Sequence, residues 1–363
     1  MSRMDGMNYA PQGKPSPVCR PGDFTFAAAH LDHGHIYGQC NGLLEAGGEL
    51  KWVYDPDRSR VEAFCARFPS ARPASSLGEI LDDDSVNLVA AAAIPSERGR
   101  LGCYVMEAGK DYFTDKTPFT AMDQLERARE TVALTGRKYM VYYSERLHSE
   151  CAVLAGQLVE QGTIGRIYQT VGFGPHRLSA ASRPAWFFER AKYGGILCDI
   201  GSHQSEQFLF FSGAKNAEVN HSAAANVNHP EHPELEDFGE ACLIGDNRAS
   251  GYYRVDWFTP DGLRSWGDGR LFLYGTKGTI ELRKYVDPAA ANPEGDQLYL
   301  VDDSGEHHLS CAGKVGYPFF GQLILDCLNR TENAMSQEHA FRAAELCLKA
   351  QTQALRLTRD EKA

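Results

Sequence analysis

The order of apolar and polar residues changes character near residue 143. Before that point, short continuous apolar runs alternate with segments whose apolar residues follow a helical spacing. Residues 24–30 and 50–54 are β-like runs, and the segment between them is helical up to Gly47. Strands that alternate with helices are typical of βαβ units and of a parallel sheet. The pattern therefore predicts a doubly wound α/β domain over residues 24–143.

The rest of this first part keeps the same alternation. The elements predicted there are, in chain order, helix 61–68, helix 77–81, strand 86–94, helix 101–108, strand 111–114, helix 123–134 and strand 138–143. The run at 86–94 is apolar throughout, as a strand of a parallel sheet is when helices cover both of its faces.

Beyond residue 143 the pattern is mainly β-like. One helix is predicted at 149–160, and a series of short strands separated by Gly, Asn, Asp and Pro then predicts a largely antiparallel sheet. Two amphipathic helices, 319–328 and 337–357, end the chain. We predict an arm at 1–23, a dinucleotide-binding domain at 24–143, an α+β domain for substrate and oligomerisation at 144–318, and C-terminal helices at 319–363.

Composition and charge narrow the function classes. The chain has 363 residues, which favours two domains, and its net charge of −11 argues against nucleic-acid binding, which needs a basic face. None of the ten cysteines forms a C-x-x-C pair, so we expect reduced thiols in a cytoplasmic protein. No apolar run approaches the ~20 residues of a membrane span. The N-terminus lacks an apolar signal region, and we expect a loose arm there.

The turn after the first strand is a candidate for holding a dinucleotide. With Gly34 as the second glycine of G-x-G-x-x-G, the first position is Asp32 and the third is Tyr37. The second strand ends at Asp55, about 20 residues beyond the turn, where such folds place the carboxylate that binds the adenosine ribose. A carboxylate there favours NAD over NADP, although Arg58 and Arg60 could soften that preference.

Three histidines in this region offer an alternative interpretation, which is a metal cluster. His30, His33 and His35 lie within one turn. We do not favour a metal, because histidines at this spacing on a turn do not converge readily and no carboxylate–histidine ligand pattern lies beside them.

Lys116 follows the predicted strand 111–114. Ligands of open α/β sheets bind beyond the carboxyl ends of the strands, so Lys116 lies where the reactive ring of a cofactor would be expected. A partly desolvated lysine can act as an acid or hold a substrate hydroxyl. The alternative is a surface lysine at a strand end.

The segment 193–206 opens with Gly194 and Gly195 and then places Asp199 and His203 four residues apart. On a helix these two side chains project from one face, about 5–6 Å apart at Cβ. A carboxylate beside an imidazole fixes its tautomer and makes it a usable general base near neutral pH. The alternative is a helix start in which Asp199 is a cap and His203 is a satisfied core histidine.

Taken together, these segments resemble the Gfo/Idh/MocA oxidoreductase family of glucose–fructose oxidoreductase and inositol dehydrogenase. The similarity runs over about residues 24–357. It rests on the turn 31–38, Asp55, the strand end Ile94-Pro95, and Asp115-Lys116-Thr117-Pro118 in place of E-K-P. It rests also on the G-G-x-x-x-D-x-G-x-H motif at 194–203, on Glu236-Asp237-Phe238 and on residues 274–281.

The resemblance implies a Rossmann domain, then an α+β domain with a large open sheet, with C-terminal helices that return toward the first domain. It implies hydride transfer between NAD (NADP possible) and a secondary hydroxyl of a sugar, polyol or inositol-like substrate, in a homo-dimer or homo-tetramer formed through the open sheet. The catalytic group would be Lys116, Asp199 and His203. The cofactor-binding residues would be Asp32, Gly34, His35, Ile36, Asp55, Ile94, Pro95 and Lys116.

The sequence departs from the family pattern at several positions. Lys116-Thr117-Pro118 replaces Lys-Pro, Asp32 replaces a glycine, residues 96–98 replace the usual polar residues, and Glu206 stands where aspartate is common. Two other functions therefore stay open. One is a lyase or hydrolase that uses tightly bound NAD as a transient oxidant, and the other is a nucleotide-binding regulator without turnover.

Overall fold

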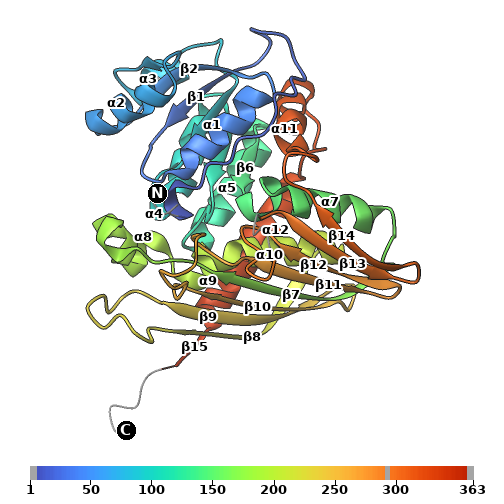
Figure 1. The fold of residues 1–363 in the computed structure, drawn as a ribbon. Helices are drawn as coiled ribbons and strands as arrows, with labels where there is room; N and C mark the ends of the chain where they lie inside the picture. Colours follow the sequence, from blue (N-terminus) through green and yellow to red (C-terminus); the bar gives the residue numbers. More distant parts are fainter. Residues whose placement is uncertain (1–5, 291–294, 358–363) are drawn as a thin grey trace. The chain divides into compact units, whose positions relative to one another are not determined.

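The computed structural model describes residues 6–290 and 295–357. The chain divides into two compact units (Figure 1). The first, which we call the Rossmann unit, comprises residues 7–142 and 317–341. The second, which we call the β-sheet unit, comprises Gly6 and, among the described residues, 143–290, 295–316 and 342–357. Each unit is built around its own sheet.

The Rossmann unit contains a six-stranded sheet in the order β3-β2-β1-β4-β5-β6. All of its strand pairs are parallel, so the predicted doubly wound α/β fold is confirmed. Every residue of β1, β4, β5 and β6 is buried, because helices cover both faces of the sheet. The strands are β1 (Thr25–Ala29), β2 (Glu49–Tyr54), β3 (Arg72–Pro73), β4 (Leu88–Ala91), β5 (Asp111–Asp115) and β6 (Tyr139–Tyr142).

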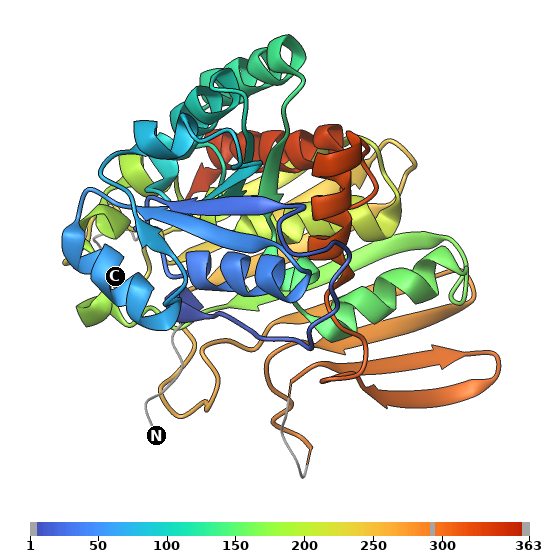
Figure 2. The same ribbon diagram turned by 90° about the horizontal axis from the view of Figure 1, so that it is seen from above.

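The strand order runs outward from β1 in one direction to β3 and from β4 in the other direction to β6, so the helices that follow β1 and those that follow β4 cover opposite faces of the sheet. Figure 2 shows α1 on one face and α4 packed beside α5 on the other. The helices are α1 (His35–Glu45), α2 (Arg58–Arg67), α3 (Leu77–Leu81), α4 (Pro95–Glu107), α5 (Met122–Thr135) and α11 (Pro318–Asn329). Helix α11 contacts α1, so the first of the two predicted C-terminal helices is part of this unit.

The N-terminal segment runs along α1 and is held there by hydrogen bonds. The side-chain Nδ2 of Asn41 donates to the carbonyl of Pro11 (3.2 Å), and the backbone amide of Gly13 donates to Glu45 Oε1 (2.8 Å). The amide of Val18 donates to the carbonyl of Ala46 (2.9 Å), at the end of the helix. The prediction of a loose arm is therefore wrong for residues 7–18, which we call the strap, while residues 1–5 lie outside the described part of the chain.

The β-sheet unit contains a nine-stranded sheet in the order β14-β13-β12-β11-β7-β10-β9-β8-β15. Only the pairs β7–β10 and β8–β15 are parallel among the strands described, which confirms the predicted mostly antiparallel sheet. The strands are β7 (Ile167–Pro175), β8 (Ala217–Ala225), β9 (Phe238–Gly245), β10 (Ser250–Asp256), β11 (Arg270–Gly275), β12 (Gly278–Arg283), β13 (Gln297–Asp302), β14 (Gly305–Ser310) and β15 (Leu355–Arg356).

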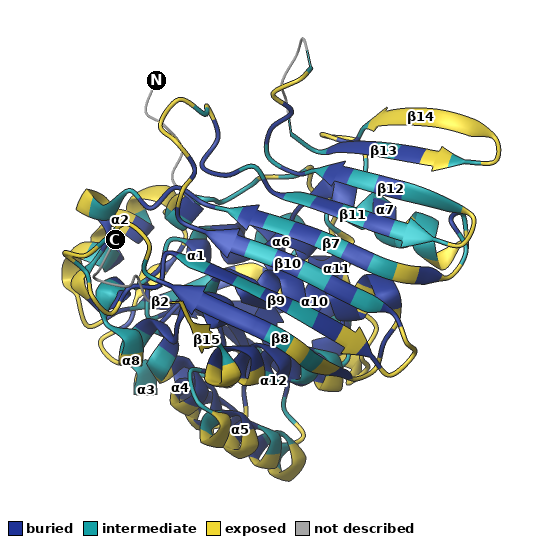
Figure 3. Cartoon of the chain, turned by 90° about the horizontal axis from the view of Figure 1, so that it is seen from below, coloured by how far each residue is buried: buried dark blue, intermediate teal, exposed yellow. Residues whose placement is uncertain are grey.

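Helices cover one face of this sheet. Helix α10 (Gly201–Ser212) packs on β7, β9 and β10, and α7 (Glu150–Glu160) packs on β12 and β13. On the other face, seen in Figure 3, no described helix covers the central strands. Residues along β10 and β11 accordingly alternate between buried and half-buried. The unit also contains the short helices α6 (Ser144–Leu147), α8 (Arg190–Tyr193) and α9 (Ile196–Asp199), the 3-10 turns at Ala180–Ser182 and Ala185–Phe188, and most of α12 (Gln337–Gln353).

Strand β7 has no side chain beneath α10 at Gly172. A Cβ atom at that position would lie 2.1 Å from Gln204 Oε1. Gly172 therefore leaves the room that the side-chain amide of Gln204, the residue after His203, occupies in this structure. Within the described residues, none of the helices has the length and apolar character needed to cross a bilayer.

Candidate active site

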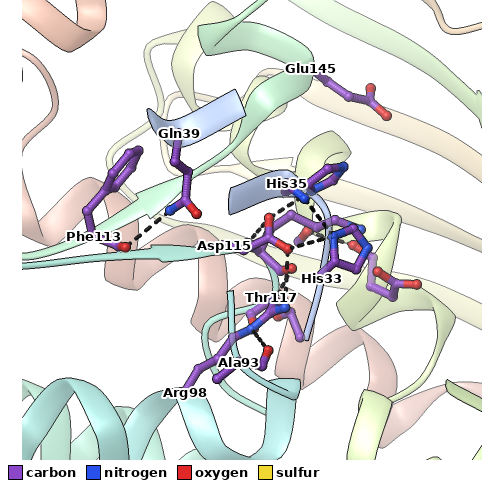
Figure 4. A network of polar contacts seen from close by, with 12 residues as sticks. His33, His35, Gln39, Ala93, Arg98, Phe113, Asp115, Thr117 and Glu145 are labelled. Atoms are coloured by element: carbon purple, nitrogen blue, oxygen red, sulfur yellow. Dashed lines mark hydrogen bonds and ion pairs between the residues drawn. The ribbon is translucent and has the colours of Figure 1, made fainter. Parts of the chain in front are cut away.

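A buried carboxylate organises the carboxyl edge of the Rossmann sheet. Asp115, the last residue of β5, is completely buried and accepts hydrogen bonds from three segments (Figure 4). Its Oδ1 accepts hydrogen bonds from His35 Nδ1 (2.9 Å) and from the amide of Lys116 (2.8 Å). Its Oδ2 accepts from a guanidinium nitrogen of Arg98 (3.1 Å). One side chain thereby joins the turn before α1, the first turn of α4 and the strand end that carries Lys116.

The surroundings keep Asp115 ionised. Burial alone would raise its pKa, but the neighbouring His35 and Arg98 outweigh burial and hold the pKa well below its ordinary value. His33, by contrast, is kept neutral, because burial and the neighbouring His35 lower its pKa well below the ordinary value. The amide of His35 donates to His33 Nδ1 (3.2 Å), which is the lone pair that a neutral imidazole offers.

Arg98 connects this edge to the loop after β4. It is completely buried, and its Nε donates to the carbonyl of Ala93 (2.7 Å). Another of its nitrogens donates to the carbonyls of Lys116 and Thr117 (3.1 Å to the latter), the first of which belongs to a cis peptide bond. Sequence reasoning noted Arg98 only as a departure from the family pattern. Its position three residues after Pro95, in a helix that starts at the site, was the available signal.

The histidines converge more than the sequence suggested. The atoms of His33, His35 and Asp115 that could bind a metal lie within 4.8 Å of one another. The expectation that the turn histidines do not converge is therefore wrong for His33 and His35. His30 is not part of the group and instead makes an edge contact with Tyr54. A cation here would meet the guanidinium of Arg98, which already occupies Asp115 Oδ2. We therefore interpret the group as a hydrogen-bonded network.

In the predicted dinucleotide turn, the residue with the left-handed backbone conformation is not a glycine of the motif. The left-handed backbone conformation occurs at His30 (φ 52°), directly after β1, while Gly34 has the φ of −64° that any residue adopts. Glycine is needed at position 34 because a Cβ there would lie 2.5 Å from the carbonyl oxygen of Met7 in the strap. Because Gly34 has no side chain, the strap can pass close to its Cα atom.

The charge of Asp32, which replaces a glycine of the family turn, is compensated. Arg60 of α2 donates to Asp32 Oδ1 (2.5 Å) and lies 3.5 Å from Asp55 Oδ1. Burial opposes the charge of Arg60, but the carboxylates of Asp32 and Asp55 raise its pKa above the ordinary value. The guanidinium therefore balances two acidic groups at the end of the sheet where a dinucleotide would bind.

Asp55 ends up where the sequence predicted, directly after β2, but its carboxylate is largely occupied. Its Oδ2 accepts from the amide of Leu31 (2.6 Å) and its Oδ1 from the amide of Asp57 (2.7 Å). The residue is 4% exposed. Asp55 thus also shapes the turn after β1, in addition to the ribose-binding role expected of it.

The other predicted cofactor residues lie at the same edge. Ile94 and Pro95 form the N-cap and first residue of α4, and Lys116 is 6% exposed after β5. Ile36 is completely buried, so its side chain belongs to the core.

This edge fits a dinucleotide. Helix α1 directs its N-terminus to the carboxyl ends of the strands, and within the described residues the amides of Asp32 and Gly34 have no protein acceptor. Free amides at a helix N-terminus are favourable for a pyrophosphate.

In the β-sheet unit, the glycine pair and the helix behave as the sequence predicted. Gly194 and Gly195 have φ values of 88° and 97°, which favour glycine. Helix α9 ends at Asp199, and Ile200 continues the right-handed backbone into α10. Asp199 is half-buried and His203 is 2% exposed.

The start of α9 is held by two side chains from distant segments. Glu236 Oε2 accepts the amide of Ile196 (2.9 Å), and Gln351 Oε1 of α12 accepts the amide of Leu197 (2.9 Å). These bonds satisfy amides that the first turn of a helix leaves open. Glu236 is itself paired with Arg190 and Arg356. The segment that carries Asp199 is therefore fixed at its beginning by charged and amide groups.

Glu206, noted as a departure from the family pattern, is part of a buried ion pair. Both of its oxygens accept from Arg146 Nε of α6 (2.7 and 3.0 Å). The guanidinium also lies over the ring of Phe210. Glu206 thus anchors α10 to α6.

A cavity of about 600 Å³ lies in the Rossmann unit between α4 and α5. None of the predicted site residues lines it, although His30, the residue before the turn, does. Its walls carry acidic and basic side chains, among them Glu97, Arg100 and Arg127. The cavity is therefore beside the predicted cofactor residues and does not contain them.

Comparisons with known proteins agree with this architecture. The profile described as "Oxidoreductase family, NAD-binding Rossmann fold" matches residues 26–143, and the GFO/IDH/MocA C-terminal domain matches residues 153–281. A solved structure of a provisionally assigned oxidoreductase from Erwinia carotovora atroseptica is 50% identical, with a TM-score of 0.89, and the match covers 92% of this chain and 100% of that one. The fold and site thus define an NAD-binding oxidoreductase. The chain belongs to the GFO/IDH/MocA family.

More distant relatives have named substrates. Levoglucosan dehydrogenase, solved with NADH and levoglucosan, is 17% identical with a TM-score of 0.74, over 90% of this chain and 97% of that one. At that identity the likeness shows the fold. A D-xylose dehydrogenase from Paenarthrobacter nicotinovorans is 26% identical over 153 residues, which are 40% of this chain and 39% of the relative. The match thus spans about two fifths of the length of that curated relative.

Protonation of His33 should make the protein acid-sensitive. Its lowered pKa means that the unfolded chain binds the proton more tightly, so stability is lost as the pH falls below ~6.5. Between pH 7.5 and pH 5 this loss reaches about 2 kcal/mol for one group. In His33→Gln that part of the loss should disappear, as measured by urea unfolding at both pH values. His307→Gln, at an exposed histidine, serves as the control. An unchanged acid sensitivity in His33→Gln would contradict the assignment.

Arg60→Ala should weaken dinucleotide binding. The change leaves Asp32 and Asp55 uncompensated beside the turn, where they repel the phosphates. We expect about a tenfold rise in the Kd for NAD, or about 1.4 kcal/mol, at low salt and a smaller effect at high salt. Isothermal titration calorimetry measures both, with Arg72→Ala on the exposed strand β3 as the control. Equal affinities of Arg60→Ala and wild type at low salt would show that Arg60 has no such role.

Proposed function

We propose that the protein is an NAD-dependent dehydrogenase that transfers a hydride between the nicotinamide and a secondary hydroxyl of a sugar, polyol or inositol-like substrate. The observation that carries the proposal is Lys116, held at the end of β5 by Asp115 and Arg98 beside the dinucleotide turn. The helical turn with Asp199 and His203 supports it. So do the printed names of two relatives, D-xylose dehydrogenase and levoglucosan dehydrogenase, both of which are sugar dehydrogenases by name.

The proposed roles follow from the chemistry of alcohol oxidation. Bound NAD would supply the hydride acceptor. Loss of hydride from carbon requires that the hydroxyl proton leave, and an imidazole nitrogen of His203 would take it. The Lys116 ammonium would donate a hydrogen bond to the hydroxyl oxygen and stabilise negative charge that develops there. Asp199 would orient the imidazole and balance its charge.

The cofactor is proposed to be bound by the turn before α1 and by the strand ends. Asp32, Gly34 and His35 would surround the pyrophosphate through the backbone, while Ile94 and Pro95 would form the wall at the end of β4. Two carboxylates, Asp32 and Asp55, would lie near the ribose, which supports NAD over NADP because a 2′-phosphate would meet negative charge. Arg58 and Arg60 of α2 leave some affinity for NADP.

We propose further that the open sheet face pairs with a second copy of the chain. Aromatic side chains form a row across it: Phe173 lies 6.2 Å from Phe272 between ring centroids, Phe272 lies 6.4 Å from Tyr274, and Tyr274 lies 6.4 Å from Tyr168. Tyr168 is 46% exposed, and large apolar patches of this kind mark association surfaces.

Phe272→Glu should shift the protein toward the monomer, because a charge in the middle of the row would have to be desolvated on pairing. Light scattering after size-exclusion chromatography measures the mass. The control is Leu134→Glu, at an apolar residue that is 81% exposed on α5. A wild type that is monomeric at micromolar concentration would end this proposal, and so would an unchanged mass of the Phe272→Glu variant.

His203→Ala should lower turnover by about 10²–10⁴, the loss expected for a missing general base. The measurement is NADH formation at 340 nm across a panel of sugars and polyols. His221→Ala is the matched control, since His221 lies on β8 with a side chain that is 40% exposed. Near-wild-type turnover of His203→Ala on a substrate that the wild type oxidises would remove His203 from the role of base.

A further inference from the structure

The β-sheet unit contains a buried ion pair that the proposed reaction does not use. Lys284, directly after β12, places its Nζ 2.9 Å from Oε2 of Glu145 in α6. Both side chains are only 1% exposed. Removing two charges from water is costly, and a well-packed apolar pair is often as stable or more stable at such a position. The charges of the pair therefore call for an explanation other than packing.

The pair is bonded to the turn of α10 that carries His203. Gln204 Nε2 donates to Glu145 Oε2 (2.9 Å), and Lys284 Nζ donates to Gln207 Oε1 (2.5 Å). Gln207 Nε2 in turn donates to the carbonyl of His203 (2.9 Å) and reaches Glu145 Oε2 at 3.4 Å. Residues next to His203 and one turn beyond it are thus held by the two charges.

A second imidazole lies on the other side of Glu145. His176, directly after β7, directs Nε2 toward Glu145 Oε1 at 4.0 Å, while its Nδ1 lies 3.1 Å from the carbonyl of Gly174. Within the described residues, Oε1 of Glu145 has no hydrogen-bond partner. Lys284 therefore binds only one oxygen of the Glu145 carboxylate, and the negative charge of Glu145 also acts on other neighbouring side chains.

We propose that Glu145 and Lys284 are positioning residues that set how readily His203 holds a proton. This inference rests on the proposed function, in which His203 is the base. Glu145 stabilises the imidazolium that forms when His203 takes the hydroxyl proton. Lys284 opposes it, and the balance of the two keeps His203 neutral before the reaction and able to accept a proton during it.

The charge state of Glu145 agrees with this role. Burial would raise its pKa, but Lys284, His203 and His176 lower it to about 2. Electrostatic coupling is mutual, so a carboxylate that feels the charge of His203 also raises the proton affinity of His203. The other titratable and charged groups on α10 and on the elements packed against it stay the same in the variants below. They are Asp199 of α9, Arg146 of α6 with Glu206, Tyr253 of β10 and His176.

Three variants test the proposal on the full chain. Glu145→Gln removes the negative charge with the same shape, Lys284→Met removes the positive charge, and the double variant removes both. The pKa of His203 is measured by NMR titration of histidine-labelled protein, with the His203 signals assigned by their absence in His203→Gln. No substrate or cofactor is needed for this readout.

We expect the two single variants to shift the pKa of His203 in opposite directions. The pKa of His203 should fall by about one unit in Glu145→Gln and rise by about one unit in Lys284→Met. In the double variant it should return close to the wild-type value. The acid limb of the pH profile of kcat/KM should move in the same directions wherever the variants turn over. A purely structural role would not produce shifts of opposite sign that cancel.

The same pKa of His203 in the wild type and in Glu145→Gln would overturn the proposal. If Lys284→Met does not fold, the comparison of wild type, Glu145→Gln and the double variant still decides, because the double variant must then lie above Glu145→Gln. Failure of the proposed function is a separate result. It would show as an active His203→Ala variant, while the NMR shifts of His203 would be unaffected by that outcome.

Discussion

The ionised carboxylate of Asp115 is the constraint on which the Rossmann unit depends most. A completely buried negative charge is tolerable only if donors surround it, and these donors come from His35, Arg98 and the amide of Lys116. Each belongs to a different segment at the carboxyl edge of the sheet. Satisfying one charge therefore fixes the turn before α1, the start of α4 and the backbone at Lys116 together. The contacts that compensate the charge of Asp115 therefore also determine the shape of the proposed site.

The β-sheet unit uses the same physical device around His203. Its proposed base sits on a turn whose beginning is fixed by Glu236 and Gln351 and whose later residues are bound to Glu145 and Lys284. Gly172 leaves room beneath that turn for the side-chain amide of Gln204. These bonds hold the backbone on both sides of His203, and a fixed backbone is one part of what a preorganised base requires.

Much of this could be predicted from sequence because it is local. The alternation of strands and helices, the carboxylate of Asp55 after β2, and the glycine pair before Asp199 all follow from patterns within about 20 residues. What could not be predicted depends on partners far along the chain. The strap is held by Asn41 and Glu45, which only the folded structure brings beside it. Arg98 was visible as a departure, but no sequence pattern shows that its side chain bridges the ends of β4 and β5 by binding Ala93, Thr117 and Asp115.

The turn that carries His33 and His35 is another case that the sequence alone could not predict, because its side chains lie closer together than their spacing suggested. Spacing alone argued that His33 and His35 would stay apart, but the carboxylate at the end of β5 draws both rings to within 4.2 Å of each other. Likewise, Asp32 looked unfavourable beside a pyrophosphate until Arg60 of α2 was found to balance it. In both cases a charge from a neighbouring strand or helix decides what the turn can hold.

The turn before α1 is best tested as a cofactor site by titrating the nucleotide-free protein with NADH, followed by nicotinamide fluorescence and by thermal unfolding. We expect saturable binding, displaced by NAD, with stabilisation of about 2.7 kcal/mol at a ligand concentration of 100 Kd. A folded protein whose absorbance shows no retained nucleotide, and which binds neither NADH nor NADPH at millimolar concentration, would contradict the assignment of the turn before α1 as a cofactor site.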